Sequence, residues 1–580
     1  MSTTRTCFPD RRRRLVTLAC LLFGSAPAAQ AQVVLVPSSP QIGSSNPITA
    51  EPPVSRPHTQ PCVVQLFQSL RFADFTPKVF AYAPPAGCPG PWARVVLSAD
   101  FTVTAGRQFD RTAAFYLGHA NIYYGTTAEP RATLSPSWHV ERDVTDLTPI
   151  FESAETGEAN IGNFVGVSGG VTYDGIIYAS AALEFYPASD AQRAPRTPDL
   201  VVPVNGPGGD AGTLGSSTSQ ITQTLTLPTN VERAYLDVIA QSQSNDEFWY
   251  FCVPSDQATN LESCGNTPFR ETEVTLDGQP AGVAPVYPWI YTGGIDPYLW
   301  EPIPGVQTLD FRPYRVDLTP FAAVLADGNP HVLGISVYNV DSYFLATANL
   351  LLYTDHGARR VTGGLLSSTL SAAPAPVVAE HIQVNPSGPT YTGNISVSSR
   401  REFAISGYVD TSHGRVQTTF EQTVSFLNRQ EFDVSPSTDI QNVQQATTVD
   451  SRVSTRDGST VSTREQHFSY PLRIDFSFVV NADGSQTQTT TSEQGDSEQG
   501  DLVRESASGG SQVHDSSLEN EVRATDTLNF DAAGNFLGPS GSMTTQRYRS
   551  QDSSGGCYSR TLKAQAKKLV SVSDGSGCPH

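Results

Sequence analysis

Basic residues are scarce in this sequence. Its 580 residues include 37 Lys and Arg against 57 Asp and Glu, which gives a formal net charge of −20 at pH 7. Nucleic acids and anionic membranes attract positive charge, so we expect neither as a partner. A neutral partner such as a glycan is compatible with this acidity, and so is acidity that only aids solubility.

Helical patterns are also rare, and so are long apolar runs. Apolar residues mostly alternate with polar ones in short segments rich in Val, Thr, Tyr and Phe, punctuated by 46 Gly and 42 Pro. Such alternation with frequent turns predicts an all-β protein, and a chain of this length is too long for one hydrophobic core. After the N-terminal segment, no stretch is long and apolar enough for a membrane helix.

Metal and nucleotide motifs are missing. The sequence has no H-E-x-x-H, P-loop, EF-hand loop or C-x-x-C pair, and its 10 His are scattered. We therefore expect no metal and no cofactor. One G-x-S-x-G match, Gly166–Gly170, has the spacing of a hydrolase nucleophile, but no helix follows it, so a glycine-rich turn between strands is the better interpretation.

The N-terminus has the pattern of an export signal. A basic segment (1–14) precedes an apolar segment (15–26), and Ala29-Gln30-Ala31 fits a small-residue cleavage site. We expect residues 1–31 to be a signal peptide, cleaved near Ala31 after Sec or twin-arginine export. The mature protein would be bacterial, and either periplasmic or secreted.

Cysteine usage agrees with export. Two of the eight Cys lie in the expected signal peptide, and the other six fall into three pairs that are local in sequence. An even number in an exported chain favours disulfides, although several connectivities are open. The simplest pairing is Cys62–Cys88, Cys252–Cys264 and Cys557–Cys578.

Changes in composition divide the rest of the chain. We expect two tandem jelly-roll-like sandwiches that form the catalytic unit, with a groove between them for a ligand, and a β-rich C-terminal domain of unknown role. A stretch poor in apolar residues, 487–501, reads as a mobile loop. The expected boundaries are a Pro/Ser-rich tether at 32–60, the sandwiches at 61–200 and 221–360, a Gly/Ser-rich linker at 201–220, and the C-terminal domain at 361–580.

Three short motifs place acidic residues beside arginine or aromatic rings. Asp110 and Arg111 end GRQFDR between two strand-like runs, Asp246 and Glu247 precede three aromatics in SNDEFWY, and Arg270 and Glu271 adjoin in PFRETEV. Aromatic faces bind sugar rings, and a carboxyl group beside a ring can have a raised pKa. Each motif has a structural alternative, such as a surface ion pair or a satisfied acid at a strand end.

These motifs occur in a familiar order. Together with YPWIYTGGIDPYLWEP and PYRVDLTPF they resemble, over roughly residues 62–356, the acidic peptide:N-glycanases of the peptide-N-glycosidase A type. More distantly, the FDR triplet and LPTNVERAYLDVIAQ are similar to the bacterial peptide-N-glycosidase F enzymes, which have two jelly-roll domains. The resemblance implies an amidase that cleaves the bond between Asn and the first N-acetylglucosamine of an N-glycan.

The resemblance also implies roles for individual residues. Asp110 matches the principal catalytic acid, Arg111 its arginine neighbour, and Glu247 a second essential glutamate, with Glu271 as its rival. The bacterial family has a further functional glutamate on the strand after its D-V-T motif, but NFVGVSGGVTYDG has no acid before Asp174. The third carboxylate is therefore absent or supplied from elsewhere.

Several other residues are candidates for substrate binding. Trp249, Trp289 and Trp300 are sugar platforms or ordinary core aromatics, and TGGIDPYLW forms a rim loop of the groove. Asp246, Arg270 and Glu271 complete the candidates.

The resemblance implies an acidic pH optimum and tolerance of core α1,3-fucose. We expect a monomer that acts on N-glycosylated peptides and glycoproteins. The alternatives are an endo-β-N-acetylglucosaminidase and a non-catalytic glycan-binding protein.

Overall fold

The first sandwich consists of two antiparallel sheets. In this computed structural model, which describes residues 39–129, 131–385, 387–505, 511–575 and 578, one sheet has the order β1-β10-β3-β6 and the other β2-β7-β4-β5. Without the small hairpin β8–β9, this pairs the first strand with the eighth and the second with the seventh, which is the strand order of a jelly roll. The strands are β1 (Cys62–Phe72), β2 (Lys78–Tyr82), β3 (Trp92–Val103), β4 (Thr112–Leu117), β5 (Ala120–Thr126), β6 (Ser137–Asp143), β7 (Glu155–Ile161), β8 (Gly166–Ser168), β9 (Val171–Tyr173) and β10 (Ile177–Pro187).

The second sandwich repeats this topology. Its sheets have the orders β11-β19-β14-β17 and β13-β18-β15-β16, and β12 pairs with β19. The prediction of an all-β fold with two jelly rolls is confirmed. The strands are β11 (Leu200–Val204), β12 (Gly212–Leu214), β13 (Ile221–Leu225), β14 (Val231–Gln243), β15 (Glu271–Leu276), β16 (Gln279–Pro285), β17 (Tyr314–Asp317), β18 (His331–Tyr338) and β19 (Tyr343–Thr354).

Helices within the described residues are short and lie at strand ends. They are η1 (Thr145–Leu147), α1 (Thr148–Phe151), η2 (Ser244–Phe251), η3 (Thr319–Phe321) and α2 (Ala322–Leu325). None of them is long and apolar enough to cross a membrane.

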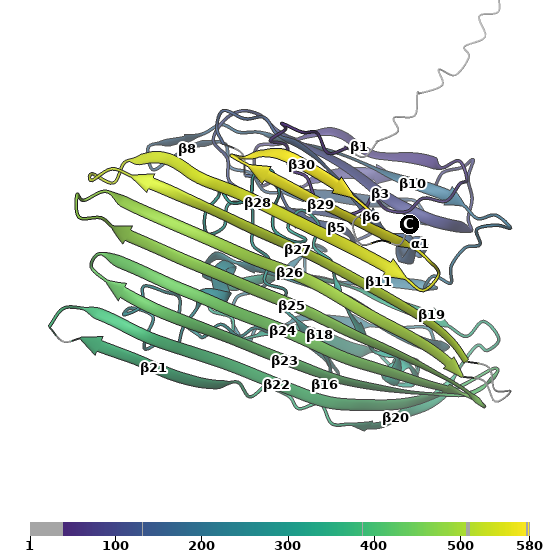
Figure 1. The fold of residues 1–580 in the computed structure, drawn as a ribbon. Helices are drawn as coiled ribbons and strands as arrows, with labels where there is room; N and C mark the ends of the chain where they lie inside the picture. Colours follow the sequence, from purple (N-terminus) through teal and green to yellow (C-terminus); the bar gives the residue numbers. More distant parts are fainter. Residues whose placement is uncertain (1–38, 130, 386, 506–510, 576–577, 579–580) are drawn as a thin grey trace, which may run out of the picture. The chain divides into compact units, whose positions relative to one another are not determined.

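The C-terminal region is one antiparallel sheet of eleven strands (Figure 1). Nearly all neighbours in the sheet are also neighbours in sequence, so it is a meander of long hairpins. Its strands are β20 (Thr362–Ser368), β21 (Val377–Asn385), β22 (Thr390–Thr411), β23 (Gly414–Ser435), β24 (Thr438–Asp457), β25 (Thr460–Val480), β26 (Gln486–Glu505), β27 (Ser511–Phe530), β28 (Phe536–Asp552), β29 (Cys557–Gln565) and β30 (Lys568–Asp574).

One face of this sheet packs on the second sandwich. Alternate residues of β23 are buried, as the period of a strand requires when one face is covered. Phe403, Phe420 and Phe426 from this face belong to the same core as Trp249 and Phe269 of the second sandwich. The first sandwich has a separate core, in which Phe101 stacks on Trp138 with ring centroids 5.2 Å apart.

Two expectations about connecting segments are corrected. Residues 201–220 are not a free linker, because they supply part of β11 and all of β12, which pair with β19. Residues 487–501 are not a mobile loop, because β26 pairs with β25 on one side and β27 on the other.

The described part of the Pro/Ser-rich segment is not a free tether either. The N–H of Gly43 bonds the carbonyl of Leu569, and the N–H of Ala50 bonds Oε1 of Gln546. Arg56 forms ion pairs with Glu141 at 2.7 Å and Glu184 at 3.0 Å. The expected signal peptide, 1–31, lies outside the described residues.

The predicted disulfides are confirmed. Cys62 bonds Cys88, Cys252 bonds Cys264, and Cys557 bonds Cys578. Three disulfides suggest an extracellular protein, because the cytosol keeps thiols reduced.

Candidate active site

Asp110 lies where the two sandwiches meet. The residue after it, Arg111, exchanges hydrogen bonds with Thr127 at 2.8 and 2.9 Å, which fixes the chain as it enters β4. Oδ2 of Asp110 accepts a 2.8 Å hydrogen bond from the N–H of Gly293, in the loop between β16 and β17 of the second sandwich. The carboxyl group of Asp110 is therefore held by both sandwiches.

Glu129 stands beside Asp110. The N–H of Asp110 donates to Oε2 of Glu129 at 3.4 Å, and the N–H of Glu129 donates to Oγ1 of Thr292 at 2.8 Å. A Cβ added to Gly293 would lie 2.2 Å from Oε2 of Glu129 and 3.3 Å from Oδ2 of Asp110. A side chain at position 293 would therefore force the Glu129 carboxyl group or the loop itself to move.

Glu129 was not among the predicted site residues, but the sequence carried a signal for it. Strands β4 and β5 form a hairpin in which Thr112 pairs with Thr126. The residues just outside the open end of this hairpin, Asp110 and Glu129, must therefore lie near each other. Glu129 thus places a carboxyl group beside Asp110, where the strand before Asp174 offers none.

Glu247 completes the cluster from the second sandwich. It lies in η2, which follows β14, and its side chain is partly buried. Burial raises the pKa of Glu247 to about 8, and the negative charges of Asp110 and Glu129 add to the effect. Within the described residues, no hydrogen bond or ion pair holds its carboxyl group.

The other two carboxyl groups are also desolvated. Burial, and then the charge of Asp110, raise the pKa of Glu129 to about 7. Burial raises the pKa of Asp110, while the Gly293 N–H and the Arg111 charge oppose this shift. Glu247 therefore holds its proton to a high pH. Near it, Asp110 has two neighbours, the Gly293 N–H and the Arg111 charge, that favour its ionised form.

Arg111 has hydrogen-bonding capacity to spare. Its guanidinium carbon lies 5.5 Å from the ring centre of Phe109. Burial lowers the pKa of Arg111, against the charges of Asp110 and Glu129. Its Nε is buried and finds no hydrogen-bond partner among the described residues.

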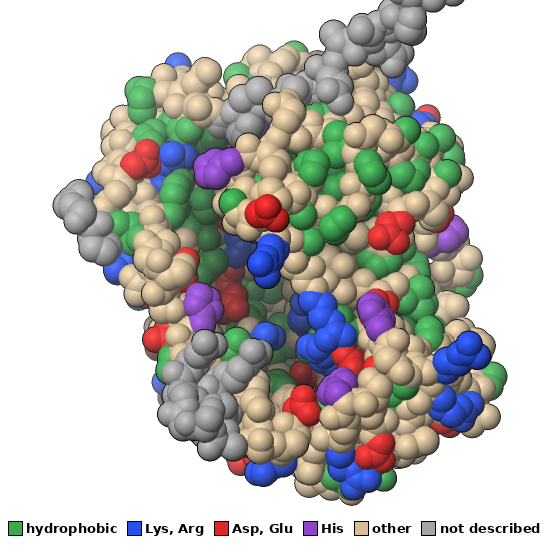
Figure 2. All heavy atoms as spheres, turned by 90° about the vertical axis from the view of Figure 1, so that its right-hand side faces the viewer, with side chains coloured by type: hydrophobic (Ala, Val, Ile, Leu, Met, Phe, Trp, Pro, Cys, Tyr) green, Lys and Arg blue, Asp and Glu red, His purple; other side chains and the backbone are tan. Residues whose placement is uncertain are grey.

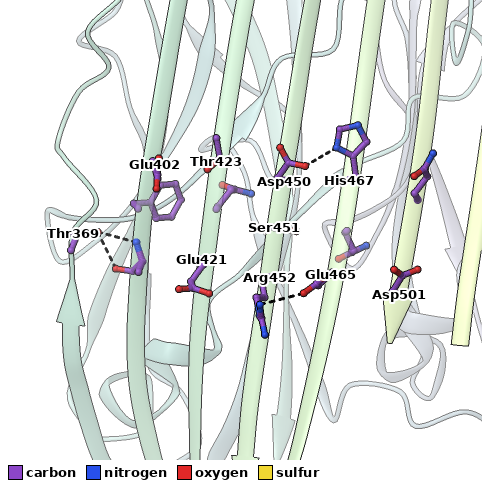
Figure 3. A pocket seen from close by; sticks show the side chains of 15 residues that line it. Thr369, Glu402, Glu421, Thr423, Asp450, Ser451, Arg452, Glu465, His467 and Asp501 are labelled. Atoms are coloured by element: carbon purple, nitrogen blue, oxygen red, sulfur yellow. Dashed lines mark hydrogen bonds and ion pairs between the residues drawn. The ribbon is translucent and has the colours of Figure 1, made fainter. Parts of the chain in front are cut away.

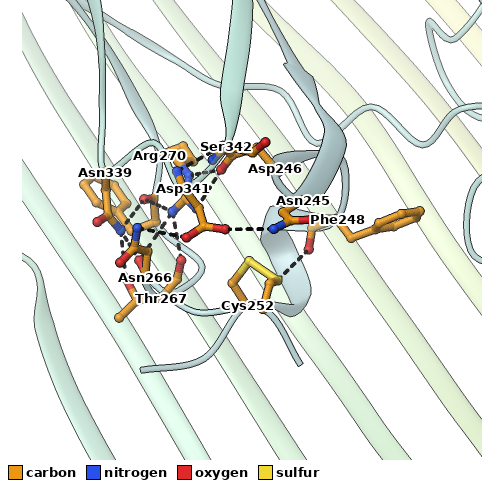
Figure 4. Close-up of polar contacts among 12 residues, drawn as sticks. Asn245, Asp246, Phe248, Cys252, Asn266, Thr267, Arg270, Asn339, Asp341 and Ser342 are labelled. Atoms are coloured by element: carbon orange, nitrogen blue, oxygen red, sulfur yellow. Dashed lines mark hydrogen bonds and ion pairs between the residues drawn. A yellow bond between two sulfur atoms is a disulfide. The ribbon is translucent and has the colours of Figure 1, made fainter. Parts of the chain in front are cut away.

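Asp246 and Arg270 form a structural pair instead of a binding site (Figure 4). Both side chains are fully buried, and Nε of Arg270 donates to Oδ1 of Asp246 at 2.9 Å. Oδ2 of Asp246 accepts the N–H groups of Asp341 and Ser342 at 3.0 and 2.7 Å. This pair ties η2 to the β18–β19 connection, and burial removes it from substrate.

Glu271, the alternative to Glu247, is buried against the C-terminal sheet. It is 1% exposed and pairs with Arg401 of the C-terminal sheet at 2.5 Å. Burial raises its pKa to about 7, and Arg401 opposes the rise. Glu271 therefore joins the sandwich to the sheet.

The three tryptophans are core residues, with exposures of 1%, 4% and 3% for Trp249, Trp289 and Trp300. Trp289 stacks on Phe311 with ring centroids 4.1 Å apart. Nε1 of Trp300 donates to the carbonyl of Gly294 at 2.9 Å, which supports the loop beside Asp110. Their burial argues against the predicted sugar platforms, because a ring without an exposed face cannot stack on a sugar.

The C-terminal sheet holds the η2 segment that carries Glu247. Nδ2 of Asn428 donates to the carbonyl of Tyr250 at 3.0 Å, and Nε2 of Gln430 donates to that of Cys252 at 3.0 Å. Nε2 of Gln441 donates to the carbonyl of Phe251 at 2.9 Å. These amides satisfy buried backbone groups of η2.

The same sheet holds the loop that carries Gly293. Gln494 accepts the N–H of Val306 and donates to the carbonyl of Pro288, both at 2.7 Å. Nζ of Lys567 donates to the carbonyl of Tyr298 at 2.9 Å. Two of the segments that form the carboxylate cluster thus rest on one sheet.

In two concave regions of the described structure, acidic side chains pair with basic ones. A pocket of about 720 Å³ on the sheet contains acidic residues, but Arg452 pairs with Glu465 and His467 with Asp450 (Figure 3). Figure 2 shows a hollowed face along which acidic and basic side chains gather. In a cavity of about 680 Å³ at the β6–η1 connection, the main charges are likewise paired, as in Arg315–Asp237 at 2.7 Å.

The family profile of the "Peptide N-acetyl-beta-D-glucosaminyl asparaginase amidase A" matches residues 51–371. The chain belongs to this family. A second profile, the C-terminal domain of the same family, matches residues 394–472. All three carboxyl groups of the cluster lie within the first match.

One relative bears the name of this family. The chain is 29% identical over 547 residues to peptide-N4-(N-acetyl-beta-glucosaminyl)asparagine amidase A of Prunus dulcis, covering 91% of this chain and 92% of that protein. Among solved structures, PNGase F, a glycosylasparaginase from Flavobacterium meningosepticum, shares 14% identity with a TM-score of 0.34 and covers 51% of this chain and 96% of its own. PNGF-II shares 13% identity with a TM-score of 0.35, covering 51% and 66%.

Proposed function

We propose that this protein hydrolyses the amide bond between asparagine and the first N-acetylglucosamine of an N-glycan. The observation that carries the proposal is the pair of carboxyl groups of Asp110 and Glu129 beside Gly293, with Glu247 close enough for their charges to raise its pKa, in a chain of the amidase family. Amide hydrolysis needs a base for the attacking water and an acid for the leaving nitrogen. The cluster offers carboxyl groups suited to both tasks.

Asp110 is the general base. It orients a water molecule toward the amide carbon of the glycosylated asparagine and accepts its proton as the oxygen adds to that carbon. Arg111, whose positive charge lies close enough to act on Asp110, stabilises the negative oxygen of the tetrahedral intermediate. Its charge also favours the ionised form of Asp110.

Glu247 is the general acid. It binds the first sugar and gives its proton to the nitrogen as the carbon–nitrogen bond breaks. The peptide then carries aspartic acid in place of asparagine, and the glycan leaves as a glycosylamine. The raised pKa of Glu247, about 8, supports a protonated acid at neutral and acidic pH.

Glu129 acts on its neighbours instead of on the substrate. Its charge raises the pKa of Glu247, and its Oε2 accepts the N–H of Asp110. An acidic pH optimum is implied by the family resemblance.

The natural substrates are N-glycosylated peptides and glycoproteins, including those with core α1,3-fucose, as the family resemblance implies. The net charge of −20 supports a protein that binds neither nucleic acid nor membranes. We infer a bacterial monomer that is exported with cleavage near Ala31, and the three disulfides are consistent with an oxidising compartment.

Mass spectrometry of a plant-type glycopeptide, incubated at mildly acidic pH in heavy-oxygen water, tests the proposal. We expect a free peptide with one labelled aspartate in place of asparagine. One sugar left on an unchanged asparagine would indicate an endo-β-N-acetylglucosaminidase. A glycopeptide that binds but stays intact would indicate a glycan-binding protein.

A further inference from the structure

Arg131 joins Glu129 to the loop that carries Gly293. It lies between β5 and β6 of the first sandwich. Its Nη2 donates to the carbonyl oxygen of Glu129 at 3.1 Å and lies 3.5 Å from Oε1 of that residue, while its Nε donates to Oε1 of Glu301 at 2.9 Å. Glu301 belongs to the loop between β16 and β17, so one guanidinium group contacts a carboxyl group from each sandwich.

The same loop holds the guanidinium group of Arg131 in place. The guanidinium carbon lies 4.4 Å from the ring centre of Tyr298, a cation–π distance. Lys567 of the C-terminal sheet contacts this ring too, with Nζ 4.5 Å from its centre, and pairs with Asp526 at 3.2 Å. The side chains of Arg131 and Glu301 are 21% and 10% exposed, so water screens their ion pair only in part.

Glu129 needs a positive partner because it stands beside a second acid. Like charges at short distance oppose each other's ionisation. Burial, and then the charge of Asp110, raise the pKa of Glu129 to about 7. Of the groups that oppose this rise, Arg131 has the largest effect. The ionised form of Glu129 therefore depends on Arg131.

Other titratable groups surround this ion pair. Glu129 also faces Arg111 and Glu247. On its other side Arg131 faces Asp296, and Lys567 acts on both Asp296 and Glu301. The charges that shift the pKa of Glu247 in the described structure are those of Asp110 and Glu129. We therefore expect Arg131 to affect Glu247 through Glu129.

We propose that Arg131 is a positioning residue of this amidase, which fixes the ionised carboxyl group of Glu129 beside Asp110. The inference rests on the proposed function, in which Glu129 acts on Glu247. Arginine suits the role because its planar guanidinium group binds Glu129 and Glu301 at the same time, whereas lysine offers a single ammonium group.

The pH profile of kcat/KM tests the proposal. In Arg131→Gln the pKa of Glu129 rises further, so Glu129 carries less charge at the pH where Glu247 loses its proton. We expect kcat/KM to fall about tenfold and its alkaline limb to move to lower pH, as in Glu129→Gln. A direct effect of the lost positive charge on Glu247 would instead move the limb to higher pH. A limb that moves to higher pH, or stays in place, would overturn the proposal.

Arg56→Gln is the matched control. Arg56 also binds two carboxyl groups, those of Glu141 on β6 at 2.7 Å and Glu184 on β10 at 3.0 Å. It therefore shows what the loss of a bridging arginine does elsewhere in the first sandwich, and we expect the limb to stay in place. Arg131→Lys keeps the positive charge and should return the limb toward its wild-type position. An equal shift in Arg56→Gln would contradict a specific role for Arg131.

A measurement without substrate separates failure of this inference from failure of the proposed function. Thermal unfolding of the wild type, Arg131→Gln, Glu129→Gln and the double variant gives the coupling between the two residues. We expect Arg131→Gln to lower the melting temperature less in the Glu129→Gln background than in the wild type at pH 8, where Glu129 is ionised, and this difference to shrink at pH 5, where Glu129 is protonated. If the coupling appears but no glycopeptide is cleaved, only the proposed function fails. If cleavage proceeds while the two effects are additive at pH 8, only this inference fails.

Discussion

The N–H of Gly293 and the carboxyl group of Asp110 are joined by a 2.8 Å hydrogen bond that crosses from the second sandwich to the first. Removing water from a carboxylate costs free energy unless hydrogen bonds or opposite charges replace the lost interactions with water. The Gly293 bond and the charge of Arg111 supply this compensation. The ionised form of Asp110 thus depends on the junction between two jelly rolls.

Replacing Gly293 by alanine should damage the site directly. The new Cβ would lie 2.2 Å from Oε2 of Glu129, so the loop or the glutamate must move. We expect stability to fall by about 1–3 kcal/mol, and kcat/KM to fall at least about tenfold. Thermal unfolding and glycopeptide hydrolysis measure the two effects. Gly215→Ala is the control, since no described atom lies within 4 Å of its new Cβ; similar results for both variants would contradict the site geometry.

Asp110→Asn should abolish most activity without unfolding the protein. Losing a general base typically costs about 10²- to 10⁴-fold in rate. The melting temperature should not fall, because an amide in this desolvated position carries no charge. The exposed residue Asp190 provides the control substitution Asp190→Asn. Full activity in Asp110→Asn, with a normal melting temperature, would remove Asp110 from the mechanism.

Glu129→Gln should change the pH profile. An ionised Glu129 disfavours ionisation of Glu247 and so raises the pKa of that acid. Without the charge, Glu247 loses its proton at lower pH. We therefore expect the alkaline limb of kcat/KM against pH, which reports the Glu247 pKa of about 8 in the wild type, to move to lower pH. A limb that stays in place, or moves to higher pH, would exclude this coupling.

Gln430→Leu should lower activity by disturbing the backbone of the segment that carries Glu247. It removes the donor to the Cys252 carbonyl and leaves a buried acceptor without its 3.0 Å partner. We expect a loss of about 1–3 kcal/mol of stability, and a fall in kcat that exceeds the change in KM, because η2 also carries Glu247. Gln444→Leu, at an exposed position of β24, is the control. If Gln430→Leu keeps the wild-type kcat, the sheet does not position η2.

Local patterns in the sequence predicted much of this fold. Alternating strands and turns predict jelly rolls, and the three local Cys pairs predict the disulfides, because both depend on neighbours in the chain. The strand β26 escaped prediction because it is poor in apolar residues. Its inward side chains are polar, and one of them, Gln494, bonds the backbone of the second sandwich at Val306 and Pro288.

The site was predicted less completely, because it depends on contacts between segments that are separate in the sequence. Asp110 and Glu247 belong to recognisable motifs, but Glu129 joins them only through the β4–β5 hairpin. An aromatic residue beside an acid does not reveal whether its ring is exposed. The C-terminal sheet decides this for Trp249, whose ring lies 6.3 Å from that of Phe426 on β23.

Side chains of the C-terminal sheet bind η2 and the Gly293 loop mainly through hydrogen bonds to main-chain carbonyl and amide groups. Such hydrogen bonds do not depend on the side chains of these two segments. The side chains of η2 and of the Gly293 loop can therefore be exchanged, by natural drift or by directed evolution of new glycan preferences, while the scaffold beneath them keeps its shape.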